Sequence, residues 1–120
     1  ETSYHLRHAH DWLVRLGDGT DESHARMQAA IDHLMPYTQE FFMPSAMETA
    51  AIKTGMGVDT RHLQAAWNTM VDEALAQATL KRPPAGGFVS TGKTGVHSEH
   101  LGFVLAEMQS LARAHPEAVW

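Results

Sequence analysis

The sequence predicts an all-α protein, and two observations carry that prediction. Apolar residues recur three and four positions apart in five segments, as they do on one face of an amphipathic helix. Nowhere do four or more residues alternate between apolar and polar with β-branched enrichment, which is the pattern of a half-buried strand. At 120 residues the chain is one domain or part of one, and we expect residues 1–120 to form a single all-α domain.

The first two helices are expected on either side of the turn DGTD. The first carries an apolar stripe that ends at Gly17. Thr20 or Asp21 can cap the second, because short polar side chains accept hydrogen bonds from the free N–H groups of the first turn. The apolar stripe of this second helix runs on to Phe42, but Pro36 lies inside it. Proline lacks an N–H group and clashes with the preceding turn, so we expect the helix to kink or split there.

Three further helices are expected in the remainder. A capping-box spacing begins at Ser45 and indicates a short third helix, which Gly55 ends. Asp59 is the expected cap of a fourth helix, and the sequence KRPP at residues 81–84 closes it. After a glycine-rich loop, a fifth helix is expected to run from about 98 until the proline at 116 ends it.

Composition excludes several classes of protein. The net charge is -5 and the pI about 5.9, which argues against nucleic acid as the main partner because phosphate binding needs a basic face. Without cysteine there is no disulfide framework, zinc ribbon or iron–sulfur cluster. No apolar run approaches the roughly 18 residues of a membrane span. We therefore expect a soluble, cytoplasmic protein with no membrane partner.

Residues 87–94 read GFVSTGKT and match the phosphate-binding pattern G-x-x-x-x-G-K-[ST]. That pattern binds ATP or GTP only where its first glycine follows a buried strand and its lysine opens a helix. Here the preceding residues are KRPPAG, a helix exit with two prolines. We therefore expect no nucleotide binding, and we interpret the match as accidental.

Nine histidines raise the question of a metal site. His5 and His8 lie three residues apart on the first expected helix, and neutral imidazole is a good ligand for zinc or iron. A di-iron site in a four-helix bundle requires Glu-x-x-His on two helices, but no Glu of this chain has a His three residues on. Asp21 and Asp59 do have that spacing, and both are better explained as helix caps. Spacing alone leaves surface imidazoles and a metal-binding protein as open alternatives.

Three segments together resemble one known family. They are YHLRHAHDWLVRLGDGTDES at 4–23, VDTRHLQAAW at 58–67 and TGKTGVHSEHLGFVLAEMQSLARAHPEAVW at 91–120. These segments are similar to motifs of the C-type subunit of ring-1,2-phenylacetyl-CoA epoxidase, and the resemblance spans nearly all of the chain. In this family the glycine and lysine of GKT belong to a loop of its own.

The resemblance implies a ferritin-like helical bundle, of which this chain would be the C-terminal part, from the last bundle helix onward. The family's enzyme is a bacterial multicomponent oxygenase that epoxidises the ring of phenylacetyl-CoA in phenylacetate catabolism. Its catalytic subunit holds a di-iron centre, and the C-type subunit pairs with it as a non-catalytic, structural protein. The competing hypothesis is a ferritin-like metal-binding protein that uses its own His and carboxylate ligands.

The same resemblance suggests roles for particular residues. Glu1 and Tyr4 stand where a catalytic relative would need Glu-x-x-His, so we expect no catalytic residue, no cofactor and no metal in this subunit. Lys93, His97 and His100 are candidate contacts with a partner subunit or with acyl-CoA. The apolar face of the first helix, if it is left uncovered in this piece of the chain, also favours self-association.

Overall fold

The structure is a computed structural model that describes residues 1–86 and 88–119. These residues contain five α-helices, three 3₁₀ helices and no strand, which confirms the all-α prediction and is consistent with a ferritin-like fold. In chain order the elements are α1 (Thr2–Gly17), α2 (Asp21–Leu34), η1 (Met35–Phe42), α3 (Ala46–Lys53), η2 (Thr60–Leu63), α4 (Gln64–Gln77), η3 (Gly92–Thr94) and α5 (His100–Ala114). Among the described helices none is long and apolar enough to cross a membrane.

The chain divides into two compact units, Glu1–Ser90 and Thr91–Trp120. The first unit holds α1 to α4, and the second holds η3 and α5. Our expectation of one domain over 1–120 stays a prediction, and each unit is described by itself below.

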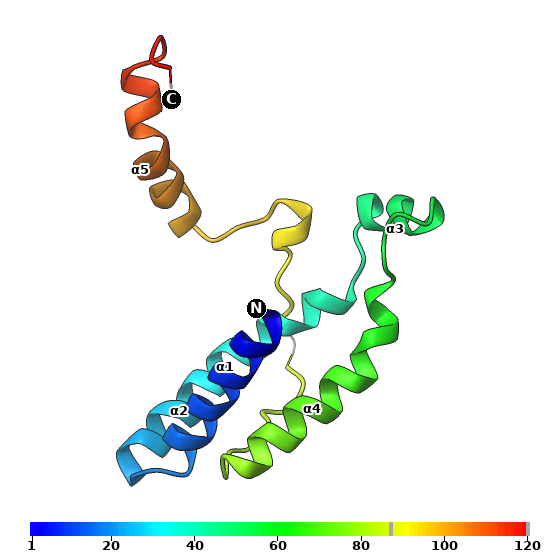
Figure 1. The fold of residues 1–120 in the computed structure, drawn as a ribbon, viewed down its shortest axis with the longest axis vertical. Helices are drawn as coiled ribbons and strands as arrows, with labels where there is room; N and C mark the ends of the chain where they lie inside the picture. The colour runs from blue at the N-terminus through cyan, green and yellow to red at the C-terminus, as the bar shows by residue number, and fades with distance from the viewer. Residues whose placement is uncertain (87, 120) are drawn as a thin grey trace. The chain divides into compact units, whose positions relative to one another are not determined.

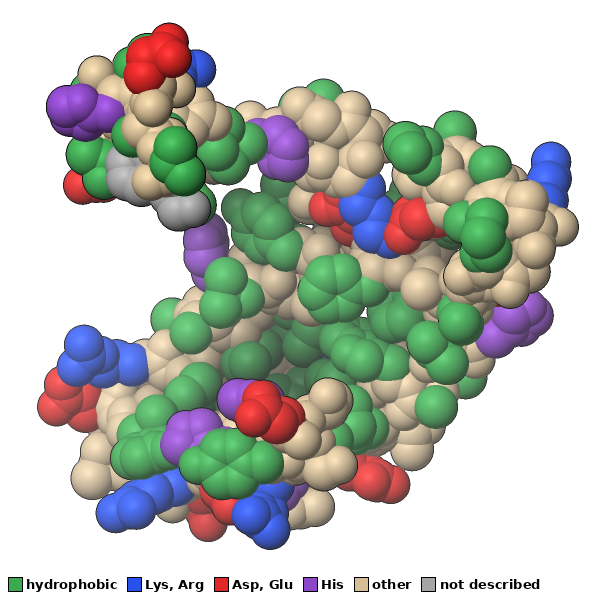
Figure 2. Space-filling model, turned by 45° about the horizontal axis from the view of Figure 1, so that its top comes forward, with side chains coloured by type: hydrophobic (Ala, Val, Ile, Leu, Met, Phe, Trp, Pro, Cys, Tyr) green, Lys and Arg blue, Asp and Glu red, His purple; other side chains and the backbone are tan. Residues whose placement is uncertain are grey.

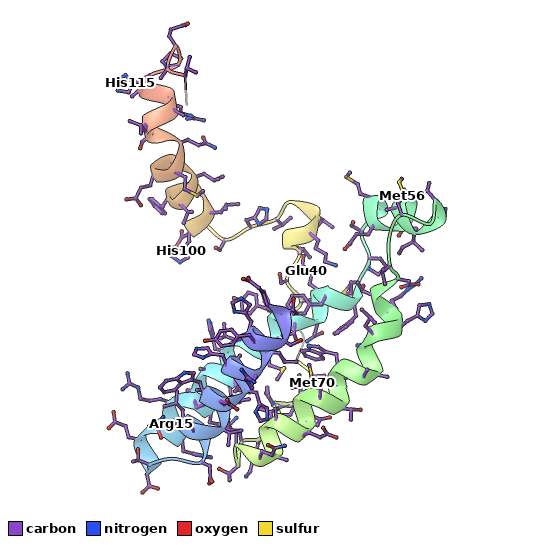
Figure 3. The ribbon with its side chains drawn as sticks, in the orientation of Figure 1. Arg15, Glu40, Met56, Met70, His100 and His115 are labelled. Carbon is purple, nitrogen blue, oxygen red and sulfur yellow. The ribbon has the colours of Figure 1, made fainter. Side chains whose placement is uncertain are left out.

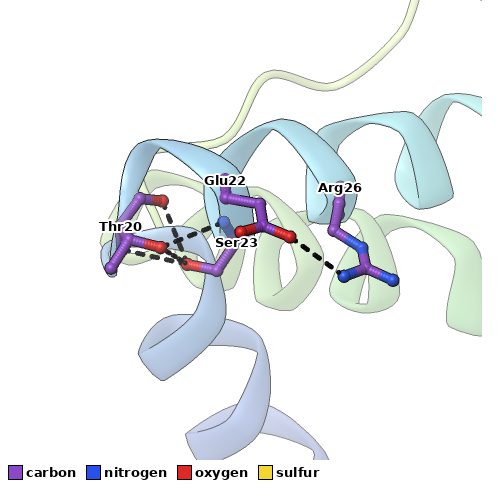
Figure 4. Close-up of polar contacts among 4 residues, drawn as sticks. All are labelled: Thr20, Glu22, Ser23 and Arg26. Atoms are coloured by element: carbon purple, nitrogen blue, oxygen red, sulfur yellow. Dashed lines mark hydrogen bonds and ion pairs between the residues drawn. The ribbon is translucent and has the colours of Figure 1, made fainter.

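The turn between α1 and α2 is closed by a capping box (Figure 4). The Ser23 backbone N–H donates to Thr20 Oγ1 at 3.2 Å, and Ser23 Oγ accepts from the Thr20 backbone N–H at 3.0 Å. One turn further on, Arg26 pairs with Glu22 at 3.2 Å on the exposed face. Thr20 is therefore the cap of α2, and the two helices lie side by side in the first unit (Figure 1).

Pro36 splits the second predicted helix, as expected. The α-helical part ends at Leu34, and residues 35–42 continue as the 3₁₀ helix η1 with the proline in its first turn. The missing proline N–H does no harm there, because the first N–H groups of a helix have no intrahelical partner.

α3 has both ends that the sequence predicts. The Ser45 backbone N–H donates to Glu48 Oε2 at 2.8 Å, and the Glu48 N–H donates to Ser45 Oγ at 3.2 Å. At the other end Gly55 has a φ of 74°. Its N–H bonds the carbonyl of Ile52, and the next N–H bonds the carbonyl of Ala51. This is a Schellman motif, in which glycine commonly takes the left-handed position.

Both ends of α4 differ from the prediction. Asp59 caps the short 3₁₀ helix η2, and the α-helix starts only at Gln64. α4 then ends at Gln77, before the prolines, in a second Schellman motif whose left-handed residue is Thr79 at φ 57°. The Leu80 N–H donates to the Leu75 carbonyl at 2.9 Å. A threonine gives little sequence signal for a helix end of this kind, because β-branched residues rarely adopt positive φ.

The core of the first unit is small and lies where α1, α2 and the end of α4 meet (Figure 1). Its buried residues are Leu75, Ala78 and Leu80. The partly buried side chains packed against it are Leu13, Val14, Met27, Ile31, Met35 and Val71. Gly17 is buried against Ala78 so closely that a Cβ on it would lie 2.5 Å from the Ala78 carbonyl oxygen.

Polar contacts hold the same junction together. The Gly17 carbonyl oxygen lies 2.7 Å from His24 Nδ1 and accepts from Thr79 Oγ1 at 3.3 Å. Gln28 binds the chain after α4 through both its amide atoms: Nε2 donates to the Lys81 carbonyl and Oε1 accepts from the Lys81 N–H, each at 2.9 Å. The three segments are therefore joined by hydrogen bonds as well as by packing.

In the second unit, α5 begins at His100, two residues later than the expected start near 98, and ends at Ala114 before the proline. Its apolar side chains are exposed, including Phe103 and Met108 at 73% and 75%.

Candidate functional site

One face of α1 carries a column of rings where a di-iron helix would carry ligands. Tyr4 stacks on His8 with ring centroids 6.0 Å apart, and His8 meets Trp12 edge-on at 6.4 Å. These residues are four apart along the helix, so their side chains follow one another on one face. The guanidinium groups of Arg7 and Arg15 lie over the Tyr4 and Trp12 rings at 5.9 Å and 5.3 Å. We call Tyr4, His8, Trp12, Arg7 and Arg15 the aromatic column.

The aromatic column takes in the position that we compared with Glu-x-x-His. Glu1 contacts only His5 within the described residues, at 3.9 Å between Oε2 and Nε2 on the exposed surface. Tyr4 occupies the position three residues on and contacts rings, with His5 edge-on at 5.7 Å. Within residues 1–86 and 88–119, no three His, Asp or Glu side chains are grouped so that they could hold a metal ion. The expected absence of a metal in this subunit stays a prediction.

A second face of α1 forms a groove with α4. The groove has a volume of about 520 Å³, and its lining residues are Ser3, Leu6, Arg7, Ala9, His10, Leu13, Met70, Val71 and Ala74. Met70 lies on the side of α4 that lines this groove and is 41% exposed (Figure 3). Figure 2 shows hydrophobic side chains gathered in the hollow between the helices of this unit. We call this feature the α1–α4 groove.

The sequence placed these groove residues on two apolar helical stripes, but it could not pair the stripes. Only the structure brings positions 6 to 13 beside positions 70 to 74, because the contact depends on how the turns between α1 and α4 fold.

Asp59 is the most strongly polarised carboxyl group of the chain's described part. Arg61 donates from Nε to Oδ1 at 2.9 Å and from Nη2 to Oδ2 at 2.6 Å, and its backbone N–H adds a bond of 3.1 Å to Oδ1. His62 Nε2 lies 3.5 Å from Oδ2. The side-chain hydrogen bonds from Arg61 lower the pKa of the Asp59 carboxyl to about 2, and the same pairing raises the pKa of Arg61. Its role is therefore that of a cap, as predicted from spacing.

The candidate contact residues near the C-terminus all belong to the second unit. Lys93 lies in the 3₁₀ turn η3, His97 in the segment after it, and His100 at the first position of α5 (Figure 3). All three side chains are exposed. Their role as contacts stays a prediction.

The phosphate-binding pattern lacks the context that it requires. Its first glycine, Gly87, lies outside the described residues. Residues 81–86 before it form neither strand nor helix, and the GKT letters form η3, a turn of three residues that ends at Gly95 with φ 91°. The prediction that the chain binds no nucleotide therefore still rests on the absence of a strand–loop–helix arrangement in the described part of the chain.

Comparison with known proteins adds what geometry alone does not provide. The sequence model of the family described as "Phenylacetic acid catabolic protein" matches residues 1–120. The chain belongs to this family. It is also 44% identical over 120 residues to the C-type subunit of the 1,2-phenylacetyl-CoA epoxidase of Escherichia coli (strain K12). The resemblance that we recognised from three sequence segments is therefore confirmed.

The match covers 100% of this chain but only 48% of the Escherichia coli protein. The chain thus spans about half the length of the curated relative that it matches. What the relative's name says about activity describes the relative, and for this chain it supports a proposal.

Proposed function

We propose that these 120 residues are part of a structural, non-catalytic subunit of a bacterial phenylacetyl-CoA epoxidase that acts in phenylacetate catabolism. The observation that carries this proposal is the 44% identity to the C-type subunit of such an enzyme, which extends over every residue of the chain. In this proposal the protein pairs with a di-iron catalytic subunit in the cytoplasm and supports its helices.

The aromatic column supports the non-catalytic part of the proposal. A di-iron helix needs carboxylate and imidazole ligands that project together from positions three apart. On α1 the corresponding face presents Tyr4 stacked on His8, and a tyrosine ring held between imidazoles is suited to packing. Iron would then be held by the catalytic partner alone.

The first experiment is to co-express the full-length protein with its candidate catalytic subunit. The native mass of the purified material and its iron content are then measured together. We expect one hetero-complex whose iron equals that of the catalytic subunit alone, and no iron in the full-length protein purified by itself. Two separately eluting proteins would contradict the pairing. Stoichiometric iron in the isolated protein would contradict the structural role and favour a metal-binding one.

The proposal includes the contact residues of the second unit. Lys93, His97 and His100 place one cation and two imidazoles within eight positions of an exposed segment, which suits an anionic contact. Replacing Lys93→Ala in the assembled complex should weaken acyl-CoA binding if the contact is with the CoA phosphates. Unchanged affinity together with weaker subunit association would assign the contact to the partner, and no change in either would remove these residues from the proposal.

A further inference from the structure

The α1–α4 groove is an open, apolar surface with the dimensions of a helix-binding site. Along α1 it runs from Ser3 to Leu13, which is about 15 Å at 1.5 Å per residue. Leu6 and Met70 remain 51% and 41% exposed along it. These are large apolar side chains on two well-formed helices, and they lack a covering element within the described part of the first unit.

Small residues in the lining would let another helix approach closely. Ala9 on α1 and Ala74 on α4 line the groove among the larger Leu6, Leu13 and Met70. Large side chains beside small ones create the ridges and grooves through which helices pack at about 8–10 Å between their axes. The polar lining groups are Ser3, Arg7 and His10. Small-molecule sites need several precisely placed polar groups within the cavity, so this lining suits an apolar helix face better than a ligand.

The rim adds a charge requirement. Arg7 lies over the Tyr4 ring and makes no ion pair within the described part of the chain. An occupant that places a carboxylate beside Arg7 would gain a favourable interaction at the edge of an apolar contact. The occupant is therefore an amphipathic helix whose apolar stripe is flanked by at least one acidic residue.

The length of the relative indicates where such a helix comes from. The Escherichia coli protein has about half of its residues outside the match. A first unit with three buried apolar side chains is small for a protein of the relative's length, since larger chains bury a greater share of their surface. We propose that the α1–α4 groove is filled by an amphipathic helix from the part of the full-length polypeptide that lies outside residues 1–120. This contact forms within one chain, and it does not depend on the enzyme to which the protein belongs.

Site-specific photocrosslinking in the full-length protein tests this proposal. A benzophenone amino acid replaces Met70 in the groove, and in a second sample it replaces Leu6 across the groove. The matched control carries the same probe in place of Met47 on α3, a methionine that is 83% exposed and lies outside the groove. The isolated protein is irradiated, separated by mass under denaturing conditions, and digested for peptide mapping.

We expect both groove probes to give adducts within a single chain, joined to one peptide that lies outside residues 1–120. The control probe should not label that peptide. Adducts of doubled mass would show that a second copy fills the groove and would overturn the proposal. Labelling that is the same at the groove and control positions would overturn it as well, because it would show that the groove is open to solvent. Since the catalytic subunit is absent from these samples, neither result depends on whether the epoxidase assignment is correct.

Discussion

Replacing Gly17→Ala tests the junction that joins α1 to the end of α4. A Cβ added to Gly17 would lie 2.5 Å from the Ala78 carbonyl oxygen, 2.8 Å from Ala78 Cβ and 3.0 Å from Leu80 Cδ1. Two of these atoms belong to Ala78, which is fully buried, and one of the two is a backbone atom. The neighbours can make room only if the helices separate.

The expected cost follows from two opposing effects. Overpacking a well-filled core costs about 1–3 kcal/mol. Alanine is favoured over glycine within a helix by about 1 kcal/mol, and this gain offsets part of the loss. We expect the free energy of unfolding to fall by about 1–2 kcal/mol, which for a protein of the relative's size corresponds to a loss of about 2–8 °C in Tm.

The assay is thermal unfolding of the full-length protein followed by circular dichroism. Gly102→Ala is the matched control, because Gly102 also lies within a helix but has open space where its Cβ would be. We expect that control to be neutral or to raise Tm. If Gly17→Ala left Tm unchanged or raised it, the close approach of α1 to Ala78 would be refuted.

Three further changes follow from single contacts. Thr79→Gly relieves a positive φ at a β-branched residue and loses only a long hydrogen bond to the end of α1, so denaturant unfolding should show a gain of up to about 1 kcal/mol. A loss of stability would mean that this hydrogen bond matters more than the strain. Gln28→Ala removes both hydrogen bonds to the Lys81 backbone and should cost about 1 kcal/mol in the same assay, whereas Gln28→Glu should keep the one from the Lys81 N–H. Asp59 has a pKa of about 2 in the folded protein against an ordinary value of 3.8, so its stabilising effect is present above about pH 4 and is lost as the pH falls toward 2. The difference in Tm between the wild type and Asp59→Asn should accordingly shrink over that pH range, and a constant difference would contradict the assigned ion pair.

Much of the local structure could be predicted because its signals act over a few residues. The capping box at Ser45 and the split at Pro36 depend on hydrogen bonds and clashes within one turn, and both are present as predicted. The left-handed end of α3 at Gly55 belongs to the same class. The end of α4 was placed too late, because Thr79 adopts a conformation that its own chemistry disfavours and that contacts with α1 stabilise.

The candidate site divides in the same way. Spacing alone showed that α1 lacks a Glu-x-x-His ligand pair, and three sequence segments were enough to recognise the family that the chain belongs to. Spacing could not show that Leu6 and Met70 line one groove, since they are far apart in the sequence and meet only through the turns between them.

The helical class, most helix ends and the family could be read from the residues alone, because they depend on local hydrogen bonding, on periodicity and on motifs. Three features needed the folded chain: the place where Gly17 meets Ala78, the end of α4 at Thr79, and the pairing of two apolar stripes into the α1–α4 groove. Each of these is a contact between distant segments, and its free energy depends on the fit of surfaces that no single segment specifies.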